Sequence, residues 1–352
     1  MSLTVRGDRV NQTDILRQIE GMEPKMQRAY LEQVRGVVDA AVIAEIERYI
    51  ESNDHGALDE ALALGVFGLL FELIRSGYMA GGAYETKQVP KAAGKSEFDV
   101  RAPAAESWLG DHIASLKAQM DRDLVDSVRV TVSSGLRAGR SPRQIALDLA
   151  GRVSKQTGKR TGGSVGLPGN FAQYVADART QLLSGDREQL KKYLTRTRRD
   201  RRFDSMVLRA LKAGKAVNKV DVERIAGRYS DRLLQTHAEM IARTEALESF
   251  SAGRDRVYQQ LVERGLPREA VTKDWDTRRD EKVRHSHSGM QGQERGLGEP
   301  FQSNSGALLQ YPGDRSLGAG YDETANCRCQ ARYSIRANYA RRDAGNLRGV
   351  IR

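Results

Sequence analysis

Four residues in the carboxyl-terminal part of the chain have the types and spacing of a metal site. His285 and His287 form an H-x-H pair in "KVRHSHSGMQG", and Cys327 and Cys329, the only cysteines among 352 residues, form a C-x-C pair about forty residues later. Two imidazoles and two thiolates are a valid tetrahedral ligand set for Zn²⁺. A disulfide between the cysteines is not expected, because residues i and i+2 of an extended chain lie near the distance limit for that bond.

The spacing also allows an interpretation without metal. Zinc ribbons and fingers normally use C-x₂₋₄-C knuckles, in which backbone amides turn toward the sulfurs, and a one-residue gap lacks that geometry. In this alternative Cys327 is a buried thiol, Cys329 is a partly exposed neighbour, and the histidines bond to backbone groups. The spacing alone therefore leaves both a structural zinc site and a metal-free cluster open.

Two predicted strands flank these residues. "VTKDWDT" at 271–277 and "CQARYSI" at 329–335 have the composition of strands, and a glycine-rich loop of about fifty residues separates them. A loop of that length is unusual in a compact domain unless something holds it in place. A metal bound between the histidines and the cysteines would give a long pinned loop in a domain with a small core.

The chain upstream of the strands is predicted to be helical. Apolar residues recur with a 3.6-residue period over 24–50, with Pro24 in the first turn. The segment 57–80 is apolar nearly all round, and Gly81 and Gly82 are expected to end its helix. The apolar surface of such a helix must be buried. Either the helix is the central one of its own bundle, or its surface is a docking site for another subunit.

Further helices are expected on both sides of a glycine-rich segment. A long helix is predicted over 104–139, a short one capped by Ser141 follows, and a long one covers 219–264. The glycine-rich segment 154–170 is interpreted as the main hinge. It is not a phosphate-binding loop, because the G-x-x-x-x-G-K-[ST] spacing and a preceding strand are both missing.

The fold class that follows is α+β and mostly helical. Residues 1–160 are predicted to form a helical region that supplies the surface for a partner, and residues 161–340 a smaller α+β domain with a few strands and the pinned loop. Residues 341–352 are predicted to be a basic tail that becomes ordered on contact with a partner.

The charge of the chain favours polyanionic partners. The net charge is +11, and residues 186–232 hold 15 basic and 7 acidic residues, which is +8 of that total. A solvated helix face is the ordinary interpretation of such a run, but we favour non-specific contact with DNA phosphates. Few aromatic residues are available for base stacking. The predicted nucleic-acid-binding residues are Lys191, Lys192, Arg196, Arg198, Arg199, Arg201 and Arg202.

Targeting signals are not expected. The opening residues "MSLTVRGDRV" lack the apolar core of a secretory signal, and the longest apolar run, 61–74, is shorter than the roughly 20 residues that span a membrane. Two cysteines without further partners indicate a reduced, intracellular protein with no membrane partner.

A set of motifs in the second half resembles a known family. In order, these are "AEMIARTEALESFSAGRDRVY", "KDWDTRRDEKVRHSHSGMQG", "EPFQ", "LLQYPGD" and "ETANCRC". In order and spacing they resemble the phage Mu F-like minor head proteins, also called phage head morphogenesis proteins. The motifs are individually weak and jointly specific, and the similarity covers about residues 165–335.

The resemblance implies a non-enzymatic minor capsid protein of a tailed phage. Such a protein acts inside the head at the portal vertex, in assembly and in genome retention or delivery, and passes through the host cytoplasm during assembly. The implied partners are the portal protein and packaged double-stranded DNA, with the scaffold or major capsid protein as further candidates.

The resemblance also bears on the metal ligands. Some members carry C-x-x-C where this chain has Arg284 to His287, so that only His287 aligns with a cysteine there. This implies His287, Cys327 and Cys329 as ligands of a structural zinc, and leaves His285, a carboxylate or no residue as the fourth. Gln291 stands where the family often has an acid.

Enzymatic alternatives are weaker. A metal-dependent nuclease or toxin-like enzyme would use His285 and His287 with Asp276, Asp280 and Glu281 to activate water, but no separate general base is evident. Arg243 and Glu245 of "IARTE" are expected in structural ion pairs, with Glu239 and Arg243 at i, i+4. A DNA-binding regulator is disfavoured because no short helix-turn-helix pattern is visible.

Overall fold

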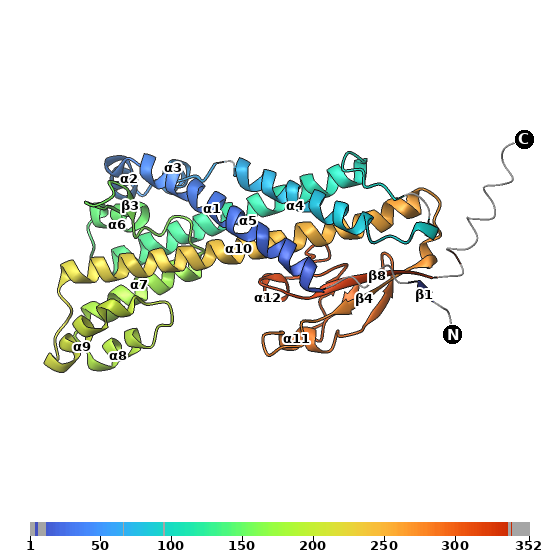
Figure 1. The fold of residues 1–352 in the computed structure, drawn as a ribbon. Helices are drawn as coiled ribbons and strands as arrows, with labels where there is room; N and C mark the ends of the chain where they lie inside the picture. Colours follow the sequence, from blue (N-terminus) through green and yellow to red (C-terminus); the bar gives the residue numbers. More distant parts are fainter. Residues whose placement is uncertain (1–3, 6–11, 66, 94–95, 337–338, 340–352) are drawn as a thin grey trace, which may run out of the picture. The chain divides into compact units, whose positions relative to one another are not determined.

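The structure is a computed structural model that describes residues 4–5, 12–65, 67–93, 96–336 and 339 (Figure 1). These residues form mainly helices, together with small antiparallel sheets, so the mostly helical α+β class is confirmed. None of the described helices is both long and apolar enough to span a bilayer. The predicted tail, 341–352, lies outside the described residues.

The element bounds are as follows. The α-helices are α1 Gln12–Ala40, α2 Ile43–Glu51, α3 His55–Ala61, α4 Gly68–Thr86, α5 Pro103–Arg137, α6 Pro142–Ala150, α7 Gly169–Leu183, α8 Arg187–Leu194, α9 Asp204–Ala213, α10 Lys219–Glu263, α11 His285–Ser288 and α12 Tyr321–Thr324. The strands are β1 Thr4–Val5, β2 Arg152–Val153, β3 Arg160–Thr161, β4 Val271–Asp276, β5 Glu294–Gly296, β6 Phe301–Gln302, β7 Leu308–Leu309 and β8 Gln330–Arg336.

The chain packs as two compact units that do not follow the predicted boundary at residue 160. The sheet unit takes its described residues from 1–27, 68–112 and 239–352, and the helical unit from 28–67 and 113–238. The long helices α1, α5 and α10 contribute residues to both units, so no linker marks the division. The segment 154–170 is therefore not a hinge between the units. It lies within the helical unit, where β2 and β3 pair as a hairpin.

The first helix begins earlier than predicted. Helix α1 starts at Gln12, and Pro24 lies inside it rather than in its first turn. Ile15, Leu16 and Ile19 are buried and extend the apolar period toward the amino terminus, which explains the longer helix. The chain leaves the helix at Ala40, and α2 covers the rest of the predicted segment.

The apolar segment 57–80 is not one helix. Helix α3 ends at Ala61, and α4 starts at Gly68 and continues through Gly81 and Gly82 to Thr86. Neither glycine ends the helix, because both serve close packing: a Cβ at Gly81 would lie 2.0 Å from the carbonyl oxygen of Phe250 on α10. At the same crossing, a Cβ at Gly253 would lie 2.0 Å from the carbonyl oxygen of Tyr78.

Other helical predictions agree with the structure. Helix α5 ends at Arg137, just before Gly139, and α10 covers 219–263. At the start of α6 the Ser141 hydroxyl accepts a hydrogen bond from the Gln144 amide, and the Gln144 side chain accepts one from the Ser141 amide. This capping box satisfies two amides that the first helical turn leaves free.

The two predicted strands are neighbours in one sheet. Strands β4 and β8 pair antiparallel, from Val271 opposite Ile335 to Asp276 opposite Gln330, and lie side by side in Figure 1. The sheet order is β1-β8-β4-β5. The connection between β4 and β8 is not structureless, because it contains β5, the β6–β7 hairpin and two short helices. The sheet thus brings the two ends of the long connection together.

Candidate metal centre and basic surface

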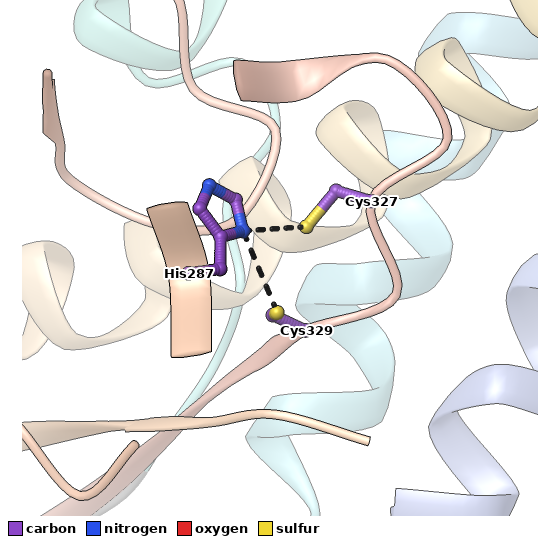
Figure 2. Close-up of side chains that lie close together, drawn as sticks. All are labelled: His287, Cys327 and Cys329. Carbon is purple, nitrogen blue, oxygen red and sulfur yellow. Dashed lines mark hydrogen bonds between the residues drawn. The ribbon is translucent and has the colours of Figure 1, made fainter. Parts of the chain in front are cut away.

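His287, Cys327 and Cys329 meet in the sheet unit. The Nδ1 atom of His287 lies 3.6 Å from the Sγ of Cys327 and 3.6 Å from the Sγ of Cys329 (Figure 2). His287 is 1% exposed, and both cysteines are buried. The three ligand atoms lie within 4.8 Å of one another, so this buried group could hold a metal ion.

A tight turn aims the two sulfurs at the ring. Asn326 has φ +55°, a left-handed conformation that asparagine tolerates better than most residues, and its amide donates to the Thr244 hydroxyl of α10. The next residues run toward β8, and both sulfurs face the imidazole in Figure 2. Arg328, between the cysteines, binds Asp280 with its guanidinium. The C-x-C spacing thus places two thiols at one nitrogen atom.

The far nitrogen of the same ring faces Glu323. Nε2 of His287 lies 2.9 Å from Oε2 of Glu323, close in distance although not well aligned as a hydrogen bond. Ser286 and Ser305 donate hydroxyl hydrogen bonds of 2.9 and 2.6 Å to the Glu323 oxygens. Burial raises the pKa of Glu323, but these two hydrogen bonds together with the electrostatic effects of His287 and Arg284 lower it overall. Glu323 is therefore a carboxylate that orients the ring from the side opposite the sulfurs.

The two cysteine thiols alter each other's pKa. A hydrogen bond from Cys329 lowers the pKa of Cys327 well below its ordinary value, and donating that bond raises the pKa of Cys329. These shifts favour the thiolate form at Cys327, and a thiolate is the form that binds metal.

Arg284 ties together the two chain segments that supply the trio. Its guanidinium donates to the carbonyl oxygens of Asp322 and Ala325, just before the cysteines. Trp275 of β4 packs edge-on against the His287 ring, with centroids 5.2 Å apart. Arg284 thus joins the segment of His287 to the segment of the cysteines by hydrogen bonds.

His285 does not belong to the site. It is exposed, and His287, two residues later, is buried. The H-x-H pair would share a face in a strand, but both residues lie on the helical turn α11, where positions i and i+2 point about 200° apart. The prediction of His285 as a fourth ligand is therefore wrong. Among the described residues, three candidate ligands lie together.

A comparison of the chain with protein-family models, curated proteins and solved structures found no match. The motifs that carry the resemblance are nevertheless in contact with one another here. Thr244 of "IARTE" accepts from the Asn326 amide of "NCRC". Gly313 of "PGD" has φ +95°, and a Cβ there would lie 3.1 Å from the Cα of Glu248 on α10. These segments therefore pack against one another in the sheet unit.

The "IARTE" helix makes ion pairs other than those expected. Arg243 pairs with Glu23 at 3.3 Å, and Glu239 accepts from Gln27, so the predicted pair between Glu239 and Arg243 is not present. Glu245 is fully buried between His112, at 2.6 Å, and Arg315, at 3.0 Å. Partners on other helices thus replace the neighbour four residues away: Glu23 of α1 for Arg243 and Gln27 of α1 for Glu239.

A second group, His112, Glu245 and Glu248, also has metal-binding residue types. Arg315 already binds both carboxylates, at 3.0 and 2.8 Å. Burial lowers the pKa of His112, but Glu248 and Glu245 outweigh burial and raise it to about 10. This group is an internal ion cluster of two cations and two carboxylates.

The acids considered for a nuclease do not join the histidines. Asp280 binds Arg328 at 2.7 Å, and Asp276 accepts from Gln291. Gln291 accepts hydrogen bonds from the Thr277 amide and hydroxyl. Among the described residues, neither metal-type group contains Asp276, Asp280, Glu281 or His285.

The predicted DNA-contacting residues lie on α8 and the following turn of the helical unit. Four of the seven have local partners. Lys191 pairs with Glu188, Arg196 binds Gln181 and lies over the Tyr229 ring, Arg199 binds Asp204, and Arg202 binds Asp200. Lys192, Arg198 and Arg201 are exposed and have no ion pair with the described residues. These three are the cations that remain free for a polyanion.

Proposed function

We propose that this chain is a structural protein whose sheet unit is held together by a Zn²⁺ ion on His287, Cys327 and Cys329. The observation that carries the proposal is the pair of equal 3.6 Å distances from Nδ1 to the two sulfurs. Zn–S bonds of about 2.3 Å and a Zn–N bond of about 2.1 Å at a tetrahedral angle separate nitrogen from sulfur by about 3.6 Å.

Hydrogen bonds from the ring to the sulfurs explain these two equal distances less well than a bound metal ion does. An imidazole Nδ1 has either one proton or one lone pair, so it makes one good hydrogen bond in the ring plane. Two buried sulfurs at the same distance fit a shared cation better. Two soft thiolates and an imidazole favour Zn²⁺ over the hard cations Mg²⁺ and Ca²⁺.

The role of this ion is structural in our proposal. The trio is buried, so a substrate would not reach an ion held there. The ion would join α11, in the connection between β4 and β8, to the start of β8. Closing this long connection stabilises the folded state, because metal binding is coupled to folding.

We further propose that the protein is a minor head protein of a tailed phage, acting at the portal vertex inside the virion. The resemblance of its motifs supports this role, and so do their mutual contacts around α10. The exposed Lys192, Arg198 and Arg201 support non-specific contact with packaged DNA. The portal protein is the principal proposed partner, and the scaffold or major capsid protein are further candidates.

Co-expression with a portal protein from the same genome tests the role. We expect the two proteins to co-purify as a complex that electron microscopy can image. A chain that stays separate from the portal during purification, and is absent from purified virions, would refute it.

A cleavage assay separates the structural role from the nuclease alternative. Purified protein is incubated with DNA and Mg²⁺, Mn²⁺ or Zn²⁺, and we expect the DNA to remain intact. Cleavage that requires a divalent cation and disappears in His287→Ala would instead favour an enzyme.

A further inference from the structure

A second charged feature, outside the metal centre, lies in the helical unit. A pocket with a cavity volume of about 280 Å³ is bordered by α1, by the turn after β3 and by α10. Four arginines line it, and Asp231 is the one acid among its lining residues. Its side chains thus carry a net charge of +3. The arginines are Arg35, Arg160, Arg228 and Arg232.

Most of these arginines are not neutralised by carboxylates. Arg160 donates to the carbonyl oxygens of Gly151 and Ala41, and Arg232 donates to that of Arg199. Arg35 is exposed and makes no ion pair with any described residue. Carbonyl partners orient a guanidinium without cancelling its charge, so the positive charge remains available to a ligand.

The single acid is already engaged. Asp231 accepts a 2.7 Å hydrogen bond from the Gly162 amide with one oxygen and lies 3.3 Å from Arg228 with the other. One carboxylate therefore offsets at most one of the four guanidinium groups.

Two glycines leave part of the pocket wall without side chains. Gly162 has φ +80°, and a Cβ there would lie 2.6 Å from the Cα of Gly227 on α10. The turn therefore packs directly against the helix. With Gly163 it presents backbone rather than side chains to the pocket.

The pocket adjoins the basic segment 196–202. Arg232 binds the carbonyl oxygen of Arg199, and Arg228 lies 3.8 Å from Asp200, which Arg202 also binds. The positive charge thus continues from the pocket to the turn that carries the exposed Arg198 and Arg201. One pocket could hold one phosphate group, whereas this longer track fits a chain of them.

We infer that the pocket seats a phosphate group of a nucleic-acid backbone, and that neighbouring phosphates follow the 196–202 turn. Arginine binds phosphate oxygens with paired N–H groups, and phosphate contacts of this kind are independent of base sequence. The inference rests on the proposed DNA contact and names the part of the surface where that contact is centred.

Fluorescence anisotropy with a labelled duplex of about 20 base pairs, over about 50 to 200 mM KCl, tests this inference. The test variant is Arg35→Gln with Arg232→Gln. The control, Arg122→Gln with Arg129→Gln, removes the same charge from exposed positions of the same unit that do not line the pocket. We expect the test variant to reduce the magnitude of the slope of log K against log salt by about 0.9, the loss of one phosphate contact, and the control to change it much less.

Further outcomes separate the pocket from the wider proposal. If the unmodified protein does not bind the duplex at low salt, the DNA contact and the pocket both fail. If it binds and the test variant behaves like the control, the pocket fails while the DNA contact stands. Pyrophosphate binding that is lost in the test variant without a change in DNA binding would assign the pocket to free phosphates and overturn the inference. If the double variant does not fold, Arg35→Gln alone, at an exposed residue, should still weaken duplex binding at low salt more than Arg129→Gln alone does.

Discussion

Oε2 of Glu323 lies 2.9 Å from Nε2 of His287, on the edge of the ring opposite the two cysteine sulfurs. A carboxylate in this position holds the ring with Nδ1 toward the sulfurs and increases the basicity of that nitrogen toward a metal. Partners of this kind are common behind metal-binding histidines. Glu323 therefore holds the Nε2 edge of the imidazole, and the Nδ1 edge faces the two sulfurs and can bind a metal.

Replacing Glu323 should therefore weaken metal binding without removing a ligand. We expect Glu323→Gln to lower the affinity for Zn²⁺ about 10- to 100-fold, measured by competition with a chromophoric chelator. Asp322→Asn, at the exposed neighbouring acid, is the matched control and should leave the affinity unchanged. Equal affinities for the two variants would show that Glu323 does not act on the ring.

Part of this site could be predicted from the sequence. The H-x-H and C-x-C spacing left a zinc site and a metal-free cluster open, and the family resemblance pointed to His287, Cys327 and Cys329, which lie together in the structure. Glu323 was missed, although "ETANCRC" places this acid four residues before Cys327, because nothing in the spacing tells which edge of the ring it faces. His285 was included wrongly because the H-x-H spacing does not tell whether the two rings share a face, and here both histidines lie on a helical turn.

The fold, too, could be predicted only in part from the sequence. Local signals such as the Ser141 cap predicted their elements well, since a cap depends on residues close in sequence. Gly81 was interpreted as a helix end, but its role depends on Phe250, far away in the chain. The boundary between the two units could not be predicted from the sequence. Helices α1, α5 and α10 each contribute residues to both units, and their composition does not change at the boundary.

The close crossing of α4 and α10 predicts a strong effect at Gly81. A Cβ at this position would lie 2.0 Å from a backbone oxygen that has little room to move, so we expect Gly81→Ala to destabilise the protein by about 1–3 kcal/mol or more. Gly110→Ala on α5, where no atom lies within 4 Å of the added carbon, should be neutral or stabilising by up to about 1 kcal/mol. Urea unfolding of both variants measures the difference, and equal stabilities would contradict the packing described.

The buried His237 predicts a sensitivity to acid. Its ring packs against Tyr30 and Phe171, its Nδ1 has no hydrogen-bond partner among the described residues, and burial lowers its pKa from 6.5 to about 4. The unfolded chain therefore binds a proton between these values and the folded chain does not, so stability falls as the pH drops below 6.5. The loss from this residue should be about 2 kcal/mol between pH 7 and pH 5.

The contribution of His237 is isolated by comparing variants. His237→Leu removes the titrating group, so its free energy of unfolding should fall less than that of the unmodified protein over the same pH range. Parallel pH profiles for the two proteins would mean that folding does not lower the pKa of His237.

The central claim is that His287, Cys327 and Cys329 hold a zinc ion that stabilises the sheet unit, and metal analysis tests it most directly. Protein purified without chelator should contain about one equivalent of zinc, should lose it in His287→Ala and Cys327→Ser, and should keep it in His285→Ala. Removing the ion with EDTA should lower the melting temperature. Less than about one fifth of an equivalent of bound metal, together with unchanged melting after EDTA, would contradict the account.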